Sequence, residues 1–223
     1  MTTKLLLYGL QRSGTNYLET LLKRRFQVHI LNESQERSHP AHKHFRLYDK
    51  KAIIPEPRYY NELHSENFAV FEQNLPQAAD AYLIISKNPY SWLISYYRWA
   101  QKCAWPAAGH HYIEEYNLFY GRWLRFSRQT KKIQFVRYID LLRYQDALLL
   151  HWQNTLGMQN RFLGGIWTRM IRRVDQSQAF TAEQRDYYIK ERYLAKYTSK
   201  ELQDVSEHLD REVISRLGYK IRK

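Results

Sequence analysis

The sequence predicts an α/β fold in three layers, with a central, mainly parallel sheet between two layers of helices. Three observations favour this fold class. Short apolar runs of strand length alternate with longer segments of helical period. Hydrophobic residues make up 44% of the 223 residues, which is enough for a sizeable core. No repeat, low-complexity tract or linker divides the chain, so we expect one domain over residues 1–223.

The first part of the chain begins with a strand signal and continues with a helix signal. Residues 4–8 form a largely apolar run that ends at a glycine, which is typical of a buried parallel strand. From Ser13 the apolar residues recur at helical spacing, and three basic residues close the segment. Residues 27–31 are a second strand candidate. Residues 32–62 are polar, rich in His and Arg, and interrupted by prolines, so they predict a loop with one short strand near 42–48.

The strongest strand signal in the chain covers residues 81–85, which read Ala-Tyr-Leu-Ile-Ile. A helix start follows it directly. Asn88 is suited to the N-cap, and Pro89 is suited to the first helical position. We therefore expect a strand that runs straight into a helix at this point.

The second half of the chain continues the alternation. Helical patterns cover 112–128 and 139–156, with a strand at 133–137 between them. Thr181 and Thr198 each begin a capping box, in which a Gln or Glu follows three residues later. Both boxes predict the start of a helix.

The charge balance indicates an anionic partner. Lys and Arg total 35 while Asp and Glu total 22, which gives a formal charge of +13. Nucleic acid, a membrane surface, phosphate and acidic glycan all fit such an excess. No stretch approaches the ~20 apolar residues of a membrane span, and the N-terminus lacks a secretory pattern. The single Cys103 excludes an internal disulfide framework and a cysteine-rich zinc module. We expect a cytoplasmic protein.

The turn after the first strand has the pattern of an anion cradle. Gly9 and Gly14 have the separation of the two glycines in the nucleotide-binding G-x-x-x-x-G-K-[ST] loop. The backbone N–H groups of a helix start there have no helical partner and attract anions. Thr15 stands in place of the loop lysine and Asn16 in place of the magnesium ligand, which makes Mg-ATP a poor fit. Arg12 supplies the cation instead. The alternative is an ordinary turn with a surface arginine.

A second candidate of the same kind follows the strand at 81–85. Lys87 lies next to the expected helix N-terminus, and Ser91 and Ser95 share one face of that helix. A cation, a helix terminus and a hydroxyl make a phosphate site. Ligands of open α/β sheets bind beyond the carboxyl ends of the strands, where both candidates lie. The alternative is a plain capped helix with an exposed lysine.

Taken together, these segments resemble the sulfotransferases that use 3′-phosphoadenosine 5′-phosphosulfate (PAPS). Residues 11–17 (Gln-Arg-Ser-Gly-Thr-Asn-Tyr) resemble the 5′-phosphosulfate loop of that family. Residues 86–97 resemble its 3′-phosphate motif, with the family's arginine replaced by lysine. Residues 136–142 resemble its Arg-Tyr-Glu-Asp-Leu segment, and 162–164 and 217–219 resemble two later segments. The resemblance runs along most of the chain.

The resemblance implies a P-loop-like fold and an enzyme that transfers a sulfuryl group from PAPS to a hydroxyl or amine. Arg12 would contact the transferring sulfuryl group. The 5′-phosphate would be bound by Ser13, Gly14, Thr15 and Asn16, and the 3′-phosphate by Lys87 and Ser95. No metal is expected, because a positioned arginine and helix-terminal N–H groups stabilise the less charged sulfuryl group.

The acceptor must lose a proton as it attacks, and many members of this family use a histidine for that step. His44 is the candidate, because histidine titrates near neutral pH. Lys43 is the candidate for the lysine that accompanies the base, although it is adjacent rather than two residues earlier. His42 is an alternative base. Members that use glutamate would point to Glu33 or Glu36.

Other interpretations stay open at this point. The acceptor is a carbohydrate, a glycolipid or a small metabolite, and the basic excess favours an anionic glycan. A P-loop-like kinase is one alternative function. A basic nucleic-acid-binding protein is another, supported by the arginine-rich stretches at 122–137 and 169–173, where Arg122, Arg125 and Arg128 share a face at helical spacing. His110 and His111 form a pair without a third metal ligand, so they are weak support for zinc.

Overall fold

The computed structural model describes residues 2–33, 44–45, 79–105, 107–161 and 181–222. Its centre is a sheet with the strand order β2-β1-β4-β5, in which every pairing is parallel. These strands are β1 (Thr3–Leu10), β2 (Val28–Ile30), β4 (Ala81–Ser86) and β5 (Ile133–Arg137). The two-residue β3 (His44–Phe45) also pairs in parallel with β1. The predicted α/β class with a parallel sheet is confirmed.

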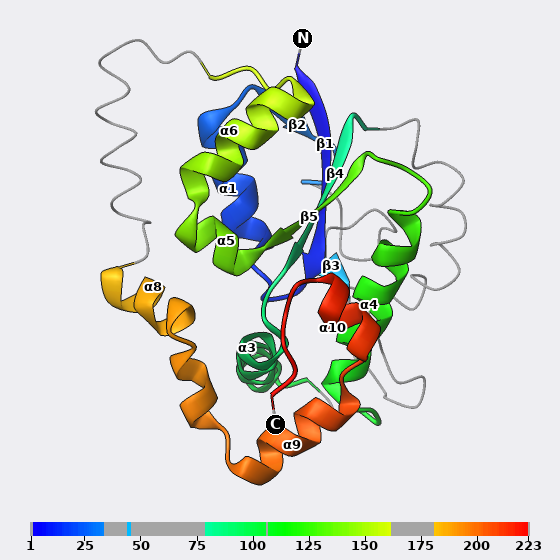
Figure 1. The fold of residues 1–223 in the computed structure, drawn as a ribbon, viewed down its shortest axis with the longest axis vertical. Helices are drawn as coiled ribbons and strands as arrows, with labels where there is room; N and C mark the ends of the chain where they lie inside the picture. Colours follow the sequence, from blue (N-terminus) through cyan, green and yellow to red (C-terminus); the bar gives the residue numbers. More distant parts are fainter. Residues whose placement is uncertain (1, 34–43, 46–78, 106, 162–180, 223) are drawn as a thin grey trace.

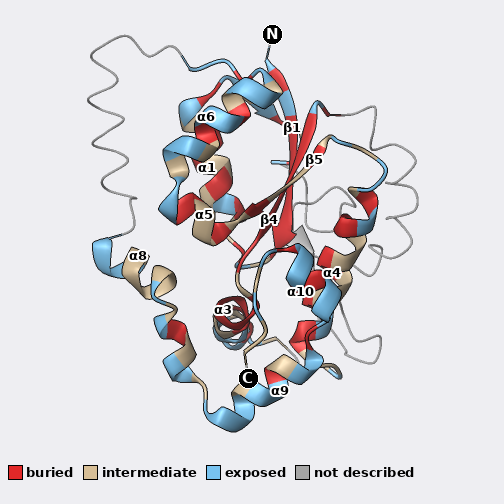
Figure 2. Cartoon of the chain, viewed as in Figure 1, coloured by how far each residue is buried: buried red, intermediate tan, exposed pale blue. Residues whose placement is uncertain are grey.

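The two central strands, β1 and β4, are buried on both faces of the sheet, which explains why they read as continuous apolar runs (Figure 2). Leu5 and Leu7 of β1 belong to one core cluster, whereas Leu6 and Tyr8 belong to the other. Successive side chains of a strand point to opposite faces, so one strand supplies both cores. The sheet is therefore the middle of three layers.

One face is covered by α1 (Thr15–Arg25), α5 (Tyr138–Arg143) and α6 (Gln145–Leu156), whose apolar residues pack with Leu5 and Leu7 (Figure 1). The other core includes residues of α3 (Pro89–Lys102), α4 (Tyr112–Phe126), α9 (Ser199–His208) and α10 (Arg211–Arg216). The short α8 (Ala182–Ile189) and the 3-10 helix η2 (Arg192–Lys196) precede α9 in the sequence. None of the helices in these described ranges is long and apolar enough to cross a membrane.

Most of the predicted elements are present, with small changes at their ends. The strand expected at 27–31 is shortened to β2, and the strand expected near 42–48 is β3. The helix expected at 139–156 is two helices, because Tyr144 leaves the helical conformation with φ −131° and ψ 35°. Hydrophobic period cannot show this break, since both halves have a buried side. Both capping boxes are formed, at Thr181 and at Thr198.

The strand order places a crevice at the carboxyl ends of β1 and β4. These strands are neighbours, but the helices that follow them leave in different directions. Helix α1 packs on one face of the sheet and α3 on the other. Open α/β sheets bind their ligands at such a switch point, because the two loops separate there. Both sequence candidates, Arg12 and Lys87, lie at this crevice.

Candidate functional site

The turn between β1 and α1 is tight, and its two glycines are required by their surroundings. Gly14 has φ +105°, and a Cβ there would lie 2.6 Å from the Cδ2 atom of Tyr138. A Cβ on Gly9 would lie 2.5 Å from the hydroxyl of Ser13 and 2.8 Å from Ile85. Arg12 itself has a positive φ of 69°. The turn thus brings the backbone close to its neighbours while it turns the chain into α1.

Helix α1 begins without a side-chain cap. Its N-cap residue is Gly14, and its first turn holds no acidic residue. By contrast, α3 is capped by Asn88, whose side chain accepts a hydrogen bond from the Tyr90 N–H group, and α9 is capped by Thr198. An anion at the start of α1 would take the place that a capping oxygen fills elsewhere.

Ser13 differs from the other residues of this turn. It is fully buried, its N–H group donates to the carbonyl of Leu10, and it does not line the cleft. Its hydroxyl oxygen is buried beside Gly9 and has no hydrogen-bond partner among the described residues. The Ser13 side chain therefore packs inward, under the turn, and does not reach the cleft.

Lys87 lies directly after β4, and its side chain is almost completely buried, with 5% of the residue exposed. Its Nζ donates to the Ser95 hydroxyl at 2.9 Å, so the structure brings these two candidate residues together. It also donates to the Tyr188 hydroxyl at 3.4 Å and lies 4.7 Å from the centre of that ring. Burial and, to a smaller degree, the nearby charge of Arg12 together lower the pKa of Lys87 to about 7.

Arg12 and Lys87 share one cleft of about 480 Å³. Among the described residues, the lining contains no carboxylate, and neither cation forms an ion pair. The lining residues come from the β1–α1 turn, the start of α1, the residue after β4, and helices α3, α5 and α8: Gln11, Arg12, Gly14, Thr15, Asn16, Tyr17, Lys87, Ser95, Trp99, Tyr138 and Tyr188. Two uncompensated positive charges beside an uncapped helix N-terminus favour an anionic ligand.

Aromatic rings form much of the remaining wall. The Tyr138 ring meets Tyr17 and Tyr188 edge to face, at centroid distances of 6.3 and 5.3 Å. The guanidinium of Arg12 lies over the Trp99 ring, 5.0 Å from its centre. Trp99 belongs to the aromatic run from Trp92 to Trp99, of which the sequence predicts that some members line the cleft. Sequence reasoning missed Tyr138 and Tyr188 as cleft residues, and Tyr188 arrives from α8 with no local signal.

The structure describes two of the candidate bases, His44 and Glu33. His44 pairs through its backbone with Gly9, so β3 brings it beside the end of β1, where the β1–α1 turn begins. Lys43, His42 and Glu36 lie outside the described residues. Glu33 is wrong as a cleft residue, because it does not line the cleft and forms an ion pair with Lys23 near the opposite end of α1. Lys23 is eight positions after Thr15 in α1, which places it about 12 Å further along the helix axis.

The histidine pair has structural roles. His110 contacts the fully buried carboxylate of Glu115 at 3.0 Å. His111 caps α4, because its Nδ1 accepts a hydrogen bond from the Ile113 N–H group at 3.2 Å. Asp204 and His208 bring two further possible ligand atoms near His111. With Nδ1 accepting, however, a neutral His111 carries its proton on Nε2, the atom that faces Asp204. This geometry favours a helix cap over a metal ligand.

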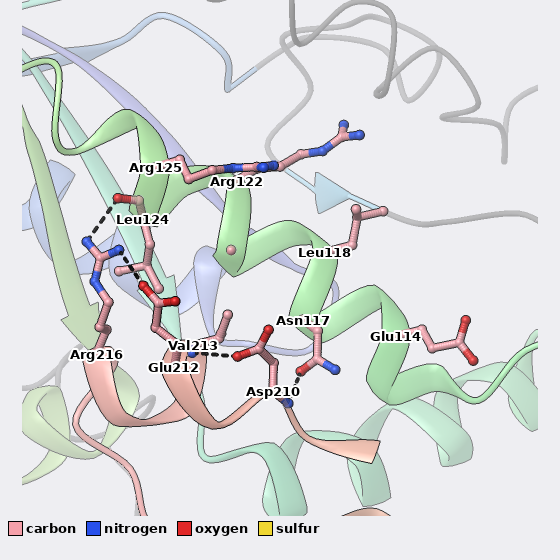
Figure 3. A pocket seen from close by; sticks show the side chains of 11 residues that line it. Glu114, Asn117, Leu118, Arg122, Leu124, Arg125, Asp210, Glu212, Val213 and Arg216 are labelled. Atoms are coloured by element: carbon pink, nitrogen blue, oxygen red, sulfur yellow. Dashed lines mark hydrogen bonds and ion pairs between the residues drawn. The ribbon is translucent and has the colours of Figure 1, made fainter. Parts of the chain in front are cut away.

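The arginine-rich stretch 122–137 is largely engaged with other residues. Arg128 lies beyond the end of α4, so the expected face of three arginines at helical spacing is wrong. Arg128 donates to Glu212 at 3.1 Å, and Arg137 donates to Asp140 at 2.6 Å. A hollow of about 530 Å³ lies between α4 and α10, and Figure 3 shows Glu212 within it beside Arg216. The stretch 169–173 lies outside the described residues.

The sequence matches no protein-family model and no curated protein.

Proposed function

We propose that this protein is a sulfotransferase with a P-loop-like fold, which transfers a sulfuryl group from PAPS to a hydroxyl or amine. One observation carries the proposal. Two cations without carboxylate partners, Arg12 and Lys87, meet an uncapped helix N-terminus in one cleft at the carboxyl ends of β1 and β4. A donor with an anionic group at each end of its ribose matches two separated positive centres.

In this proposal the backbone of the β1–α1 turn, over Gly14, Thr15 and Asn16, binds the 5′-phosphate. The 3′-phosphate is bound by Lys87, which lies just before the N-cap of α3, and by Ser95 in the second turn of that helix. The rings of Tyr138 and Tyr188 flank the cleft and offer apolar surface to the adenosine. The cleft volume of about 480 Å³ suits a nucleotide-sized ligand.

The chemical step breaks one bond and forms another at sulfur. The acceptor oxygen or nitrogen attacks the sulfur atom, the bond from sulfur to the 5′-phosphate oxygen breaks, and adenosine 3′,5′-bisphosphate leaves. Arg12, positioned over Trp99, stabilises the charge on the transferring group. The acceptor proton passes to a base, for which His44 is the candidate beside Gly9. The acceptor is a hydroxylated or amine-bearing molecule, with an anionic glycan favoured by the net charge of +13.

The two alternative functions have less support. A P-loop-like kinase needs the loop lysine and the magnesium ligand, whose places are taken by Thr15 and Asn16. A nucleic-acid-binding surface needs free cations along a face, whereas Arg128 and Arg137 are paired with carboxylates.

Thermal unfolding with added ligand tests the proposal without knowledge of the acceptor. Adenosine 3′,5′-bisphosphate at 100 times its Kd should stabilise the protein by about 2.7 kcal/mol. For a chain of this size that raises Tm by roughly 5–11 °C. A shift with ATP and Mg²⁺, with none from millimolar bisphosphate, would instead support the kinase. Binding to nucleic acid that weakens steeply with salt and ignores the bisphosphate would support the third function.

A further inference from the structure

Lys87 is an unusual cation, because it is buried among hydroxyls and aromatic rings instead of carboxylates. Its Nζ has two hydrogen-bond acceptors, the Ser95 and Tyr188 hydroxyls. Ser95 donates its own proton to the Ser91 carbonyl at 3.0 Å, so its oxygen is oriented to accept from Lys87. A charged ammonium at this position has lost most of its water without gaining a negative partner.

The groups that face Lys87 from its neighbouring elements leave this charge uncompensated. Arg12 approaches from the β1–α1 turn with the same sign. Tyr138 of α5 and Tyr188 of α8 present ring faces, at 5.4 and 4.7 Å from Nζ. Tyr116 of α4 donates its hydroxyl to the Lys87 carbonyl, which fixes the backbone but adds no charge.

Charged groups also lie on the far side of Lys87, where an adjoining hollow is lined by Arg137, Arg143, Glu191 and Arg222. The carboxylate of Glu191 forms an ion pair with Arg222, and Arg137 forms one with Asp140. Arg143 donates to the carbonyl of Ile189. Among the described residues, Glu191 is the one carboxylate that lines this hollow, and it is already engaged, so both sides of Lys87 are electropositive.

We propose that Lys87 couples ligand binding to proton uptake: its buried amine, which faces hydroxyls and no carboxylate among the described cleft residues, takes a proton from solvent when a phosphate dianion binds beside it. The inference rests on the proposed function, which places the 3′-phosphate at Lys87 and Ser95. It also gives a physical meaning to the lysine that replaces the family's arginine. A guanidinium stays charged at every physiological pH, whereas a buried amine changes its charge with its surroundings.

The consequence is a pH-dependent affinity for the 3′-phosphate. Because the pKa of Lys87 in the empty cleft is about 7, binding at higher pH requires a proton from solution. The Kd for adenosine 3′,5′-bisphosphate should then rise by about tenfold per pH unit between pH 7.5 and 9. Phosphate groups titrate near pH 6, so over this range they remain dianionic and supply no proton.

Calorimetric titration at pH 8.0 in two buffers of different ionisation enthalpy, Tris and HEPES, measures the number of protons taken up. Wild-type protein should take up about 0.9 proton with adenosine 3′,5′-bisphosphate. Adenosine 5′-phosphate, which lacks the 3′-phosphate, should bind with an uptake near zero. This pair of ligands tests the coupling on the unaltered protein.

Two variants sharpen the assignment. Lys87→Arg should bind the bisphosphate with no proton uptake and with a Kd that is nearly constant from pH 7.5 to 9. Lys200→Arg, an exposed lysine on α9, should behave as the wild type does. Bisphosphate binding without proton uptake, or uptake that persists in Lys87→Arg, would overturn the coupling while the sulfotransferase proposal stands. If neither nucleotide binds, the proposed function is overturned, and this inference with it.

Discussion

The molecule has two hollows of similar size that differ in the balance of their charges. The cleft at the ends of β1 and β4 measures about 480 Å³, and the groove between α4 and α10 about 530 Å³. In the groove, the carboxylate of Glu212 engages both Arg128 and Arg216. In the cleft, the described lining offers Arg12 and Lys87 no carboxylate. Volume alone would favour the groove as the ligand site. A cation without a carboxylate partner is the better indication of an anionic ligand, and it favours the cleft.

The largest effect should come from removing the guanidinium of the cleft. Arg12→Ala should reduce kcat/KM for sulfuryl transfer by about 10³–10⁵-fold, because an arginine on the transferring group stabilises charge in the transition state. The assay follows labelled sulfuryl transfer to any acceptor that the wild-type protein uses. Arg125→Ala, in the groove, is the matched control and should leave the rate within about twofold. Equal losses in both variants would remove the distinction between the two hollows.

The proposed base should affect turnover but not donor binding. His44→Ala should lower kcat by about 10²–10⁴-fold, the usual contribution of a general base. Its Kd for adenosine 3′,5′-bisphosphate should stay within about twofold, since the base acts on the acceptor. His29→Ala, on the exposed side of β2, provides the control. If bisphosphate binding collapses together with turnover, His44 has a structural role.

We expect Lys87 to favour binding of the bisphosphate but to lower the folding stability of the unliganded protein. Lys87→Met should stabilise the unliganded protein by about 1–3 kcal/mol near pH 6.5, because a buried charge without a partner is removed. The sign of the pH dependence follows from the lowered pKa of Lys87, about 7 in the folded state. Between pH 7 and about 10 the unfolded chain binds a proton that the folded protein does not, so wild-type stability rises with pH over this window.

Thermal unfolding of Lys87→Met and the wild type at pH 6.5 and 9.5 measures this difference. The advantage of the variant should shrink as the pH rises, and the variant should lose bisphosphate binding. A variant that is less stable than the wild type at pH 6.5 would show that Lys87 is satisfied in the empty cleft.

Alanine substitutions at two of the positive-φ glycines, Gly14 and Gly157, should have smaller effects that differ from each other. Gly14→Ala should destabilise the protein by at least about 2 kcal/mol, since the backbone strain adds to a Cβ contact of 2.6 Å with Tyr138. Gly157→Ala has similar strain, with φ +64°, but no atom lies within 4 Å of the added Cβ. Its cost should be about 1 kcal/mol. Urea denaturation of both variants measures the difference, and equal costs would mean that the turn relaxes around Tyr138.

The smallest effect is expected in the groove. Glu212→Gln removes the carboxylate that engages Arg128 and Arg216, but the Glu212 side chain is 69% exposed. Its effect on stability should stay within about 0.5 kcal/mol, as for most surface ion pairs. Bisphosphate binding should not change. Tighter bisphosphate binding in this variant would show that the groove becomes an anion site when its arginines are released.

The sequence predicts the parts of the site that depend on short-range pattern. The strands and the glycine turn before α1 follow from local patterns of apolar residues and glycines. The missed features depend on contacts between distant segments. Tyr188 reaches Lys87 across 101 positions of the chain. The Ser13 side chain points inward, and its hydroxyl lies beside Gly9 in the buried part of the turn. Neither the lowered pKa of Lys87 nor the pairing of Glu33 with Lys23 can be read from local spacing.

A crystal structure of the protein with adenosine 3′,5′-bisphosphate tests the central claim most directly, because it asks which hollow the ligand occupies. We predict that the 5′-phosphate contacts the backbone at the start of α1. The 3′-phosphate should lie within hydrogen-bond distance of Lys87 Nζ and Ser95 Oγ. A bisphosphate bound in the α4–α10 groove, or a saturated crystal with the cleft empty, would contradict the account.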